Sequence, residues 1–269
     1  MHLKVTTWNI NSVRLRLDQV GRALDEIGPD LLCLQETKCP GDCFPLSSLQ
    51  AFGYPYVVQV GQKGYNGVAI LSRFPFASVE PRSWCEREDA RHVSVVLGAE
   101  AGAAAGLAIH NFYVPAGGDV PDPALNPKFD HKLRFLSEML SWGAARDQRP
   151  TVLVGDLNVA PLEHDVWSHR QLLNVVSHTP VETEALETLR QESGFVDAAR
   201  HLTPEPAKIY TWWSYRSPDW AAANKGRRLD HIWTSTDLAE TLRSVDIYSQ
   251  ARGWLRPSDH VPVTASLLL

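Results

Sequence analysis

The sequence predicts a single α/β or α+β domain, and three observations support this prediction. Strand-like runs recur along the whole chain, several segments have apolar residues at helical spacing, and the two kinds of segment partly alternate. The chain has 269 residues, of which 44% are hydrophobic, which is enough for a large core. Because no Gly/Ser-rich or Pro-rich run divides the sequence, we expect one domain over residues 1–269.

The expected strands are short apolar or alternating runs that are separated by Gly, Pro and polar turns. The run at 30–36 is apolar at successive positions, which is typical of a strand buried on both faces. The stretch at 99–106, AEAGAAAG, indicates a small-residue turn between two strands rather than a hinge. We expect strands at 3–8, 30–36, 56–60, 67–72, 92–97, 107–114, 151–158, 209–213, 227–233, 244–249 and 261–269.

The expected helices have apolar residues at intervals of three and four. Asn11 or Ser12 could cap the first helix, and Gly28, followed by proline, ends it. The second helix opens with Pro127, whose missing N–H costs nothing in a first turn, and Gly194 closes the third. The three segments span 13–27, 127–140 and 181–194.

Charge and cysteine usage limit the function classes. The formal net charge is -5, whereas nucleic-acid binders more often are basic, but a local basic face could still bind such a partner beside an acidic metal site. The cysteine spacing lacks the second Cys/His pair of a structural zinc site, so we expect free thiols in a reducing setting. We find no signal-peptide core and no run of membrane length, and we expect a soluble cytoplasmic protein without a membrane partner. The cysteines are Cys33, Cys39, Cys43 and Cys85.

Polar residues stand repeatedly at the ends of the expected strands. A single loop Asp or Asn usually only makes a turn, so the argument rests on the whole set. Because the strands of a sheet can bring their ends together, these side chains could converge on one pocket. The set comprises Asn9, Asn11, Glu36, Tyr113, Asp156, Asn158, Asp230, His231, Asp259 and His260.

The chemistry of this set favours phosphoester hydrolysis. Carboxylate and amide oxygens are hard ligands that suit Mg²⁺ or Mn²⁺, and an imidazole beside a carboxylate can be held in one orientation. A hard metal, several donors to anionic oxygens and an activated water are the parts that such a reaction needs. A P-loop motif and a G-x-S-x-G nucleophile motif are both absent from the sequence.

Eight short sequence motifs carry a resemblance to a known family, and together they cover nearly the whole chain. In order they are TTWNINSVR, LLCLQETK, GYNGVAILS, NFYVPAGG, GDLNVAP, YTWWSYR, RRLDHIW and PSDHVPV. The chain resembles the exonuclease III-type abasic-site endonucleases of the endonuclease/exonuclease/phosphatase superfamily. One motif alone would be weak evidence, but all eight motifs in the order found in the family are not expected by chance.

The resemblance implies a fold and an activity. The fold is a four-layer sandwich in which two mostly antiparallel β-sheets pack face to face and helices flank them. The activity is Mg²⁺-dependent cleavage of the DNA backbone on the 5′ side of abasic sites, leaving a 3′-hydroxyl and a 5′-deoxyribose phosphate. We also expect 3′→5′ exonuclease and 3′-phosphatase or 3′-phosphodiesterase activity on double-stranded DNA with blocked 3′ ends, and a monomer.

The resemblance also implies a role for each site residue. Asp156 looks like the base that activates water, His260 like the contact to the scissile phosphate, and Asp230 like its orienting carboxylate. Asn158 and Tyr113 look like phosphate or water contacts. Because neighbours along a strand point in opposite directions, His260 can face the phosphate while Asp259 faces the metal side. The metal-side residues implied are Glu36, the principal ligand, with Asn9, Asn11 and Asp259.

We expect the aromatic motif YTWWSYR and a set of basic residues to bind the DNA substrate. Trp212 matches the position that lines the pocket for an extruded abasic sugar, whereas Trp213 could equally be core. Leu229 could form another wall. Two residues depart from the pattern of relatives: Ala116 stands where many have an amide donor, and Arg227 stands where some have an apolar pocket residue. The basic residues available for the DNA backbone are Lys38, Lys63, Arg73, Arg91, Lys128, Arg216, Lys225, Arg227 and Arg228.

Two alternatives remain beside this interpretation. One is another enzyme of the same superfamily, such as a nonspecific deoxyribonuclease, an inositol-polyphosphate phosphatase or a sphingomyelinase. Such enzymes share the motifs that contain Glu, Asp–Asn and Asp–His, but they generally lack YTWWSYR. A catalytically silent DNA-binding module would keep the fold, yet it would be expected to have lost Glu36 or His260, and both are present.

Overall fold

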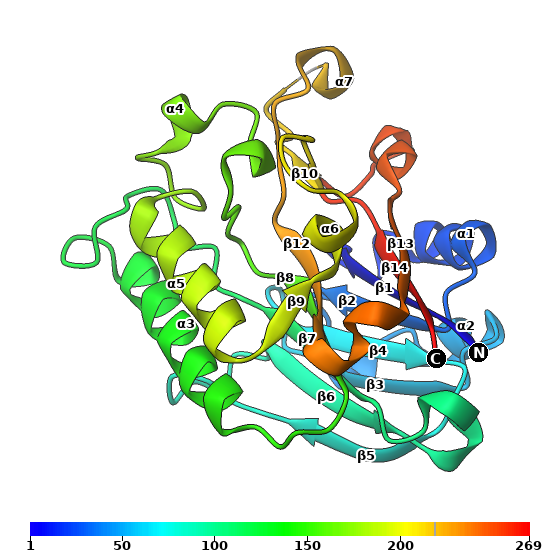
Figure 1. Cartoon of the computed structure of the whole chain (residues 1–269). Helices are drawn as coiled ribbons and strands as arrows, with labels where there is room; N and C mark the ends of the chain where they lie inside the picture. Colours follow the sequence, from blue (N-terminus) through cyan, green and yellow to red (C-terminus); the bar gives the residue numbers. More distant parts are fainter. Residues whose placement is uncertain (218) are drawn as a thin grey trace.

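Two six-stranded sheets pack face to face and form the centre of the molecule in this computed structural model, which describes residues 1–217 and 219–269 (Figure 1). The first sheet has the strand order β13-β14-β1-β2-β4-β3. Its strands are β1 (His2–Asn9), β2 (Leu31–Gln35), β3 (Tyr56–Val60), β4 (Val68–Ser72), β13 (Leu242–Ile247) and β14 (Val263–Leu268).

The second sheet has the order β5-β6-β7-β8-β12-β9, and a two-stranded ribbon, β10-β11, stands apart from both sheets. In each sheet one neighbouring pair is parallel, β1 with β2 and β7 with β8, and the other paired neighbours are antiparallel. The expected pair of packed, mostly antiparallel sheets is therefore confirmed. The bounds are β5 (Phe76–Pro81), β6 (His92–Leu97), β7 (Ala108–Tyr113), β8 (Thr151–Asp156), β9 (Phe195–Asp197), β10 (Trp212–Trp213), β11 (Gly226–Arg227) and β12 (Asp230–Ser235).

Helices cover the outer faces of the two sheets (Figure 1). The α-helices are α1 (Leu17–Ile27), α2 (Leu46–Ala51), α3 (Pro127–Ala145), α4 (His169–Leu172), α5 (Pro180–Glu192), α6 (Ala198–Leu202) and α7 (Trp220–Ala223). Short 3₁₀ helices occupy η1 (Gly41–Cys43), η2 (Ala99–Ala104), η3 (Glu163–Asp165), η4 (Thr236–Thr241) and η5 (Ser249–Gly253). No helix in the described part of the chain is both long and apolar enough to cross a membrane.

The alternation of side chains along the strands builds three apolar layers. In β2, Leu31 and Cys33 point between the sheets, whereas Leu32 and Leu34 point outward toward α1 and α2. In the second sheet, Val152 and Val154 of β8 face the central layer. Its outer face packs against α3 and α5 through large side chains that include Phe112, Phe135, Leu136, Met139, Leu153, Leu186, Leu189 and Trp233. A strand buried on both faces was expected at 30–36, and the two layers explain why four successive residues, 31–34, are apolar.

Several expected boundaries differ from the structure. The first helix begins at Leu17, and its N-cap residue Arg16 makes no side-chain capping bond. The predicted caps are therefore wrong: Asn11 and Ser12 have φ values of 47° and 87°, and the side chain of Asn11 contacts Asp259 instead. Within the strand expected at 209–213, only Trp212–Trp213 pairs as a strand, and the turn expected at 99–106 contains η2.

Candidate active site

Strand direction brings the expected site residues to one end of the sandwich. Because β1 and β2 are parallel, Asn9 and Glu36 lie at neighbouring carboxyl ends, and the parallel pair β7–β8 does the same for Tyr113 and Asp156. Strand β12 runs antiparallel to β8, so the residue at its amino end, Asp230, pairs directly with Asp156. Strand β14 is likewise antiparallel to β1, so residues 259–260, which precede its amino end, lie at the same end of the sandwich.

The backbone at these strand ends adopts the left-handed conformation in several non-glycine residues. The φ values are 47° for Asn11, 51° for Glu36, 51° for Lys38 and 54° for Asn158. This conformation is uncommon outside glycine and concentrates at functional sites, where the surrounding structure holds it. At these positions the Lys38 ammonium group contacts both Asn11 and Glu36, and the Asn158 backbone N–H donates to Asp156.

Glu36 lies at the centre of one half of the site. Its Oε1 accepts hydrogen bonds from Asn9 Nδ2 at 2.9 Å and from the Tyr113 hydroxyl at 2.8 Å. Lys38 Nζ lies 2.7 Å from Glu36 Oε2 and donates to Asn11 Oδ1 at 2.6 Å. Burial opposes ionisation, but Lys38 and these hydrogen bonds lower the pKa of Glu36, so the carboxylate is charged at neutral pH.

His260 lies at the centre of the other half, between two carboxylates. Its Nδ1 is 2.8 Å from Asp230 Oδ2, and its Nε2 is 3.6 Å from Asp156 Oδ2. The Thr211 hydroxyl donates to the same Asp230 oxygen at 2.6 Å, while the other oxygen, Oδ1, is buried without a hydrogen-bond partner among the described residues. Asn9 Nδ2 donates to Asp156 Oδ2 at 2.8 Å and so joins the two halves.

The protonation states follow from burial and from this pairing. Burial would lower the pKa of His260, but the charges of Asp230 and Asp156 outweigh it and raise the pKa to about 10. Burial raises the pKa of Asp156 to about 7, and the neighbouring His260 limits the rise. At neutral pH the imidazole of His260 is therefore a cation paired with Asp230, and the Asp156 carboxyl group is close to the midpoint of its titration.

Asp259 and Asn158 complete the set from opposite sides. Asp259 Oδ1 accepts from Asn11 Nδ2 at 3.2 Å, and its Oδ2 accepts from Trp212 Nε1 at 2.9 Å. The neighbouring residues 259 and 260 thus face different groups, as expected at a strand entrance. Asn158 uses its backbone N–H to donate to Asp156 Oδ1 at 3.0 Å, and its side-chain amide donates to Val114 O at 2.9 Å.

The oxygen-rich half fits a hard metal ion better than the histidine half does. Asp156, Asp230 and His260 are close enough to hold an ion together, but a protonated imidazole cannot ligate a metal. Glu36 offers a charged carboxylate, and the Lys38 ammonium group already bridges Glu36 and Asn11, which shows that these oxygens converge on a cation. The site therefore has the donor chemistry for a hard divalent ion on the Glu36 side.

A cavity of about 730 Å³ adjoins the site through Trp212. Trp212, Arg216 and Arg227 of the expected recognition set line it. Leu229 does not line this cavity but packs in a small apolar cluster against which Trp212 also packs, and Lys38 belongs to the Glu36 group.

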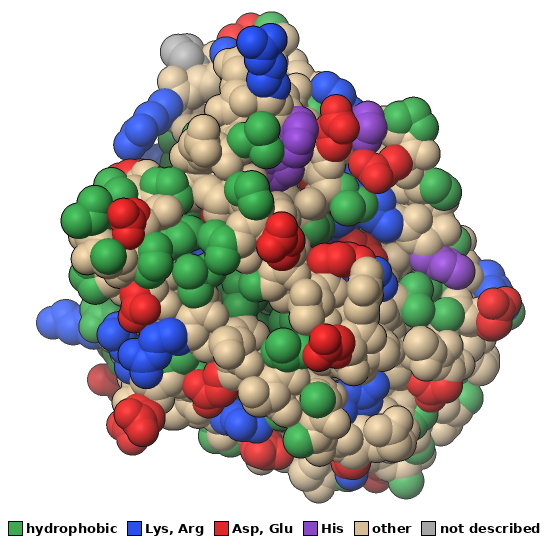
Figure 2. Space-filling model, turned by 60° about the vertical axis from the view of Figure 1, so that its left-hand side comes forward, with side chains coloured by type: hydrophobic (Ala, Val, Ile, Leu, Met, Phe, Trp, Pro, Cys, Tyr) green, Lys and Arg blue, Asp and Glu red, His purple; other side chains and the backbone are tan. Residues whose placement is uncertain are grey.

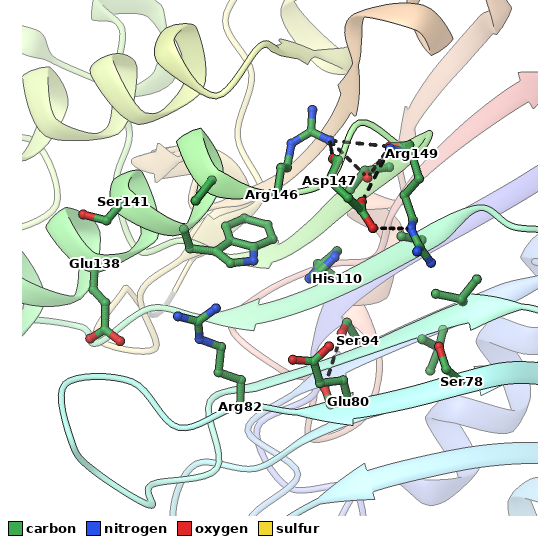
Figure 3. Close-up of a pocket in the computed structure, with 16 residues that line it drawn as sticks. Ser78, Glu80, Arg82, Ser94, His110, Glu138, Ser141, Arg146, Asp147 and Arg149 are labelled. Atoms are coloured by element: carbon green, nitrogen blue, oxygen red, sulfur yellow. Dashed lines mark hydrogen bonds and ion pairs between the residues drawn. The ribbon is translucent and has the colours of Figure 1, made fainter.

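A second cavity, of about 520 Å³, lies elsewhere on the molecule and is lined by none of the expected site residues (Figure 3). It opens beside α3 and the strands β5 and β6, and its charged side chains include Arg82, Arg146 and Arg149 as well as Glu80, Glu138 and Asp147. Asp147 accepts from Arg149 Nε at 2.7 Å, so part of this charge is already compensated. The expected site residues therefore lie at the strand ends and outside this cavity.

Two of the candidates named from the sequence have structural roles. Arg228 was considered for the DNA backbone, but this is wrong: the side chain is 1% exposed and pairs with Asp165 at 2.8 Å and Asp197 at 2.6 Å. His231 points to the other face of β12 from Asp230, and its Nε2 lies 2.8 Å from the carbonyl oxygen of Val159. Burial lowers the pKa of His231 to about 4, so it is neutral.

Sequence reasoning missed two hydroxyl groups that fix the site. Thr211 holds Asp230, and Ser258 Oγ donates to the backbone oxygen of Asn9 at 2.6 Å. Thr211 lies in the motif YTWWSYR and Ser258 in the motif PSDHVPV, but nothing in the local sequence distinguishes them from ordinary loop hydroxyls. Their partners are distant in sequence, so only the tertiary structure reveals these contacts.

Comparisons with known proteins find similar sequences and structures over nearly the whole chain. The family model described as "Endonuclease/Exonuclease/phosphatase family" matches residues 6–260. The chain is 30% identical to exodeoxyribonuclease III of Haemophilus influenzae over 98% of this chain and 99% of that protein.

Two solved structures are similar over nearly the whole chain. An AP endonuclease from Archaeoglobus fulgidus has a TM-score of 0.89 at 34% identity, covering 99% of this chain and 100% of that one. A 3′ phosphatase from Neisseria, solved with a product DNA hairpin, has a TM-score of 0.89 at 32% identity with the same coverage.

Proposed function

Because the chain belongs to the Endonuclease/Exonuclease/phosphatase family, we propose that it is a Mg²⁺-dependent DNA repair nuclease that cleaves the backbone 5′ to abasic sites. We extend the proposal to 3′→5′ exonuclease and 3′-phosphatase or 3′-phosphodiesterase activity on double-stranded DNA. The observation that carries it is the placement of His260 between Asp230 and Asp156, which the amide of Asn9 connects to Glu36.

The side chains have complementary roles in this proposal. His260, protonated and oriented by Asp230, donates to an oxygen of the scissile phosphate and offsets the charge that develops there. Asp156, with a pKa near neutrality, accepts a proton from the attacking water. The bond between phosphorus and the 3′ oxygen then breaks and that oxygen takes up a proton from solvent, which gives a 3′-hydroxyl and a 5′-deoxyribose phosphate.

The metal-side residues support the same reaction. Glu36 would hold the Mg²⁺ ion, or Mn²⁺ in its place, with help from Asn9, Asn11 and Asp259. When bound, the ion supplies positive charge that polarises the phosphate. Tyr113 orients Glu36 through its hydroxyl group, and Asn158 keeps a second amide hydrogen for the phosphate or water because the amide has two donors.

The proposed setting is the cytoplasm, and the proposed form is a monomer. Cys33, Cys39, Cys43 and Cys85 are all free, which suits a reducing compartment.

The test uses two labelled duplexes, one with a single tetrahydrofuran abasic analogue and one undamaged with a recessed 3′ end. Each is incubated with the protein in Mg²⁺, in Mn²⁺ and in EDTA, and the products are resolved by length. We expect one metal-dependent cut at the analogue and stepwise shortening of the recessed end. If neither duplex is cut in either metal, the proposal fails for DNA and other phosphoesters become the substrates to test.

A further inference from the structure

The cavity beside Trp212 combines aromatic walls with arginine and lysine side chains. The Arg227 guanidinium carbon lies 5.3 Å from the centre of the Trp212 ring, and Lys225 Nζ lies 4.7 Å from that of Trp167. All four residues line the cavity. The positive charges of Arg227 and Lys225 favour an anionic ligand at this wall over a neutral one.

Arg227 differs from its neighbour Arg228 in how its charge is compensated. Arg228 is held by the carboxylates of Asp165 and Asp197. Arg227 forms no ion pair within 1–217 or 219–269, although it is only partly exposed. Burial lowers the pKa of Arg227, and the more distant charge of Glu182 opposes this effect. A partly desolvated guanidinium without a carboxylate is in place to bind an anion from outside the protein.

The position of Arg227 is fixed by both backbone and side-chain contacts. Strand β11 pairs Arg227 with Trp212 of β10, which keeps the two residues side by side. The Nη1 group donates to Val176 O at 3.1 Å and to Ser177 Oγ at 2.7 Å. These bonds leave the Nε and Nη2 groups for a planar ligand, and a carboxylate matches that paired geometry.

The cavity also adjoins the reacting groups. Trp212 forms a β-bridge with His260, and its indole N–H donates to Asp259. A group attached to a phosphate at His260 can therefore reach the face of Trp212 and Arg227. Under the proposed function, on which this inference rests, that group is the fragment on the 3′ side of the cleaved bond.

We propose that Arg227 is a specificity-determining residue that favours substrates whose 3′-side fragment carries a carboxylate, such as a 3′-phosphoglycolate end. Water attacks the phosphorus atom, the bond between phosphorus and the DNA 3′ oxygen breaks, and that oxygen takes up a proton. The products are a DNA 3′-hydroxyl and free phosphoglycolate. Arg227 binds the carboxylate and takes no part in the bond changes.

The experiment compares three duplexes that differ only at the lesion: a 3′-phosphoglycolate end, a neutral 3′-phospho-(2-hydroxyethyl) end of similar size, and an internal tetrahydrofuran site. Values of kcat/KM are measured for the wild type, for Arg227→Gln, and for Arg227→Lys, which keeps the charge without the planar fork. Arg243→Gln is the control, because Arg243 is exposed on β13 and, among residues 1–217 and 219–269, its side chain bonds only to nearby carbonyl oxygens. Binding of the two blocked ends is also measured in EDTA, where no turnover is needed.

We expect the wild type and Arg243→Gln to prefer the carboxylate end by about tenfold or more, as a charge-assisted hydrogen bond should give. Arg227→Gln should remove the preference by slowing only the carboxylate substrate, and Arg227→Lys should retain part of it. A purely structural role would slow all three substrates equally and would overturn the inference.

Two further results would also overturn the inference. One is an equal loss on the internal site and on the phosphoglycolate end, because Arg227 would then bind a backbone phosphate. The other is the absence of any carboxylate preference in the wild type, in turnover and in EDTA binding alike. If the wild type cuts nothing, the proposed function fails, and the EDTA binding comparison still decides the role of Arg227.

Discussion

At the residue scale, the site depends on two carboxylates with different roles. Glu36 is kept ionised by Lys38, while burial moves the pKa of Asp156 toward neutrality. Environments that separate the pKa values of similar groups are typical of acid–base sites. The proposed roles, Glu36 on the metal side and Asp156 as base, follow from this difference.

Substitution of Asp156 by Asn tests the role of the base. We expect turnover to fall by about 10²- to 10⁴-fold, because the amide cannot accept the proton from water. DNA affinity should be nearly unchanged, since the carboxylate acts on water and the amide keeps the side-chain volume. Single-turnover rates and anisotropy binding give the two quantities; loss of binding by a folded Asp156→Asn protein would contradict the assignment.

Substitution of Glu36 by Ala tests the metal side. Removing the carboxylate that Lys38 and Tyr113 hold should raise the metal concentration needed for half-maximal rate. Such orienting contacts and ligands affect metal affinity by about 10- to 100-fold or more. A Mg²⁺ titration of the rate measures the shift, and an unchanged midpoint would remove Glu36 from the ligand set.

The convergence of the candidate site residues could be predicted from the sequence, but their individual contacts could not. Glu36, Asp156 and His260 stand at the ends of clear apolar strands, so their convergence follows from strand direction. The bond from Thr211 to Asp230 and the bridge of Lys38 between Glu36 and Asn11 depend on left-handed backbone turns and on tertiary packing. Neither has a local sequence pattern.

At the element scale, parallel and antiparallel pairing decides which strand ends meet. The strands at 56–60 and 92–97 were predicted with their observed bounds, because each is an apolar or alternating run between turns. Strand β5 was missed, since its sequence FASVEP is mostly exposed and lacks alternation. The start of α1 was missed because Asn11 serves the site rather than the helix.

Gly155 allows β8 to approach β7 closely beside Asp156. Its φ is 147°, and a Cβ built there would lie 1.9 Å from the backbone oxygen of Phe112. We expect Gly155→Ala to lower the free energy of unfolding by about 1–3 kcal/mol and to reduce activity by displacing Asp156. Gly253→Ala is the control, because nothing lies within 4 Å of its Cβ position. Denaturant unfolding compares the two, and equal stability would contradict the account of β8.

Asp165 ties η3 to β11–β12 and α6 through two arginines. Its Oδ2 is 2.8 Å from Arg228 Nη2, and its Oδ1 is 2.5 Å from Arg200 Nη2. We expect Asp165→Asn to cost about 3 kcal/mol or more, because Arg228 would keep a buried charge with less compensation. Asp147→Asn, which breaks an exposed pair with Arg149, should change stability by about 0.5 kcal/mol or less. Equal effects of the two substitutions in urea unfolding would refute this view.

The same carboxylate gives a pH dependence with a definite sign. Burial would raise the pKa of Asp165, but Arg228 and Arg200 hold it below its usual value of 3.8. A lowered folded-state pKa stabilises the protein above the unfolded value, and this stability is lost as pH falls through the folded value. We therefore expect the stability difference between wild type and Asp165→Asn to be constant near neutrality and to shrink below about pH 4.

At the scale of the whole molecule, DNA binding must overcome a net charge of -5. Figure 2 shows lysine and arginine side chains interspersed with acidic ones over one face. Affinity for duplex DNA should therefore depend on a few local contacts, and roughly four phosphates would give about a hundredfold loss between about 50 and 200 mM salt. Anisotropy titrations in EDTA measure this slope, and salt-independent binding would contradict a phosphate-directed surface.

The central claim is that Asp156, His260 and Glu36 direct water to the phosphorus atom on the 5′ side of an abasic site. The most direct measurement is cleavage of a natural abasic duplex in ¹⁸O-labelled water with Mg²⁺, followed by mass spectrometry of both fragments. The account predicts one ¹⁸O atom in the phosphate group of the 5′-deoxyribose phosphate, apart from any label that its aldehyde exchanges with water, and an unlabelled 3′-hydroxyl. An unlabelled phosphate beside a 3′-unsaturated aldehyde would mean elimination rather than hydrolysis, and would contradict it.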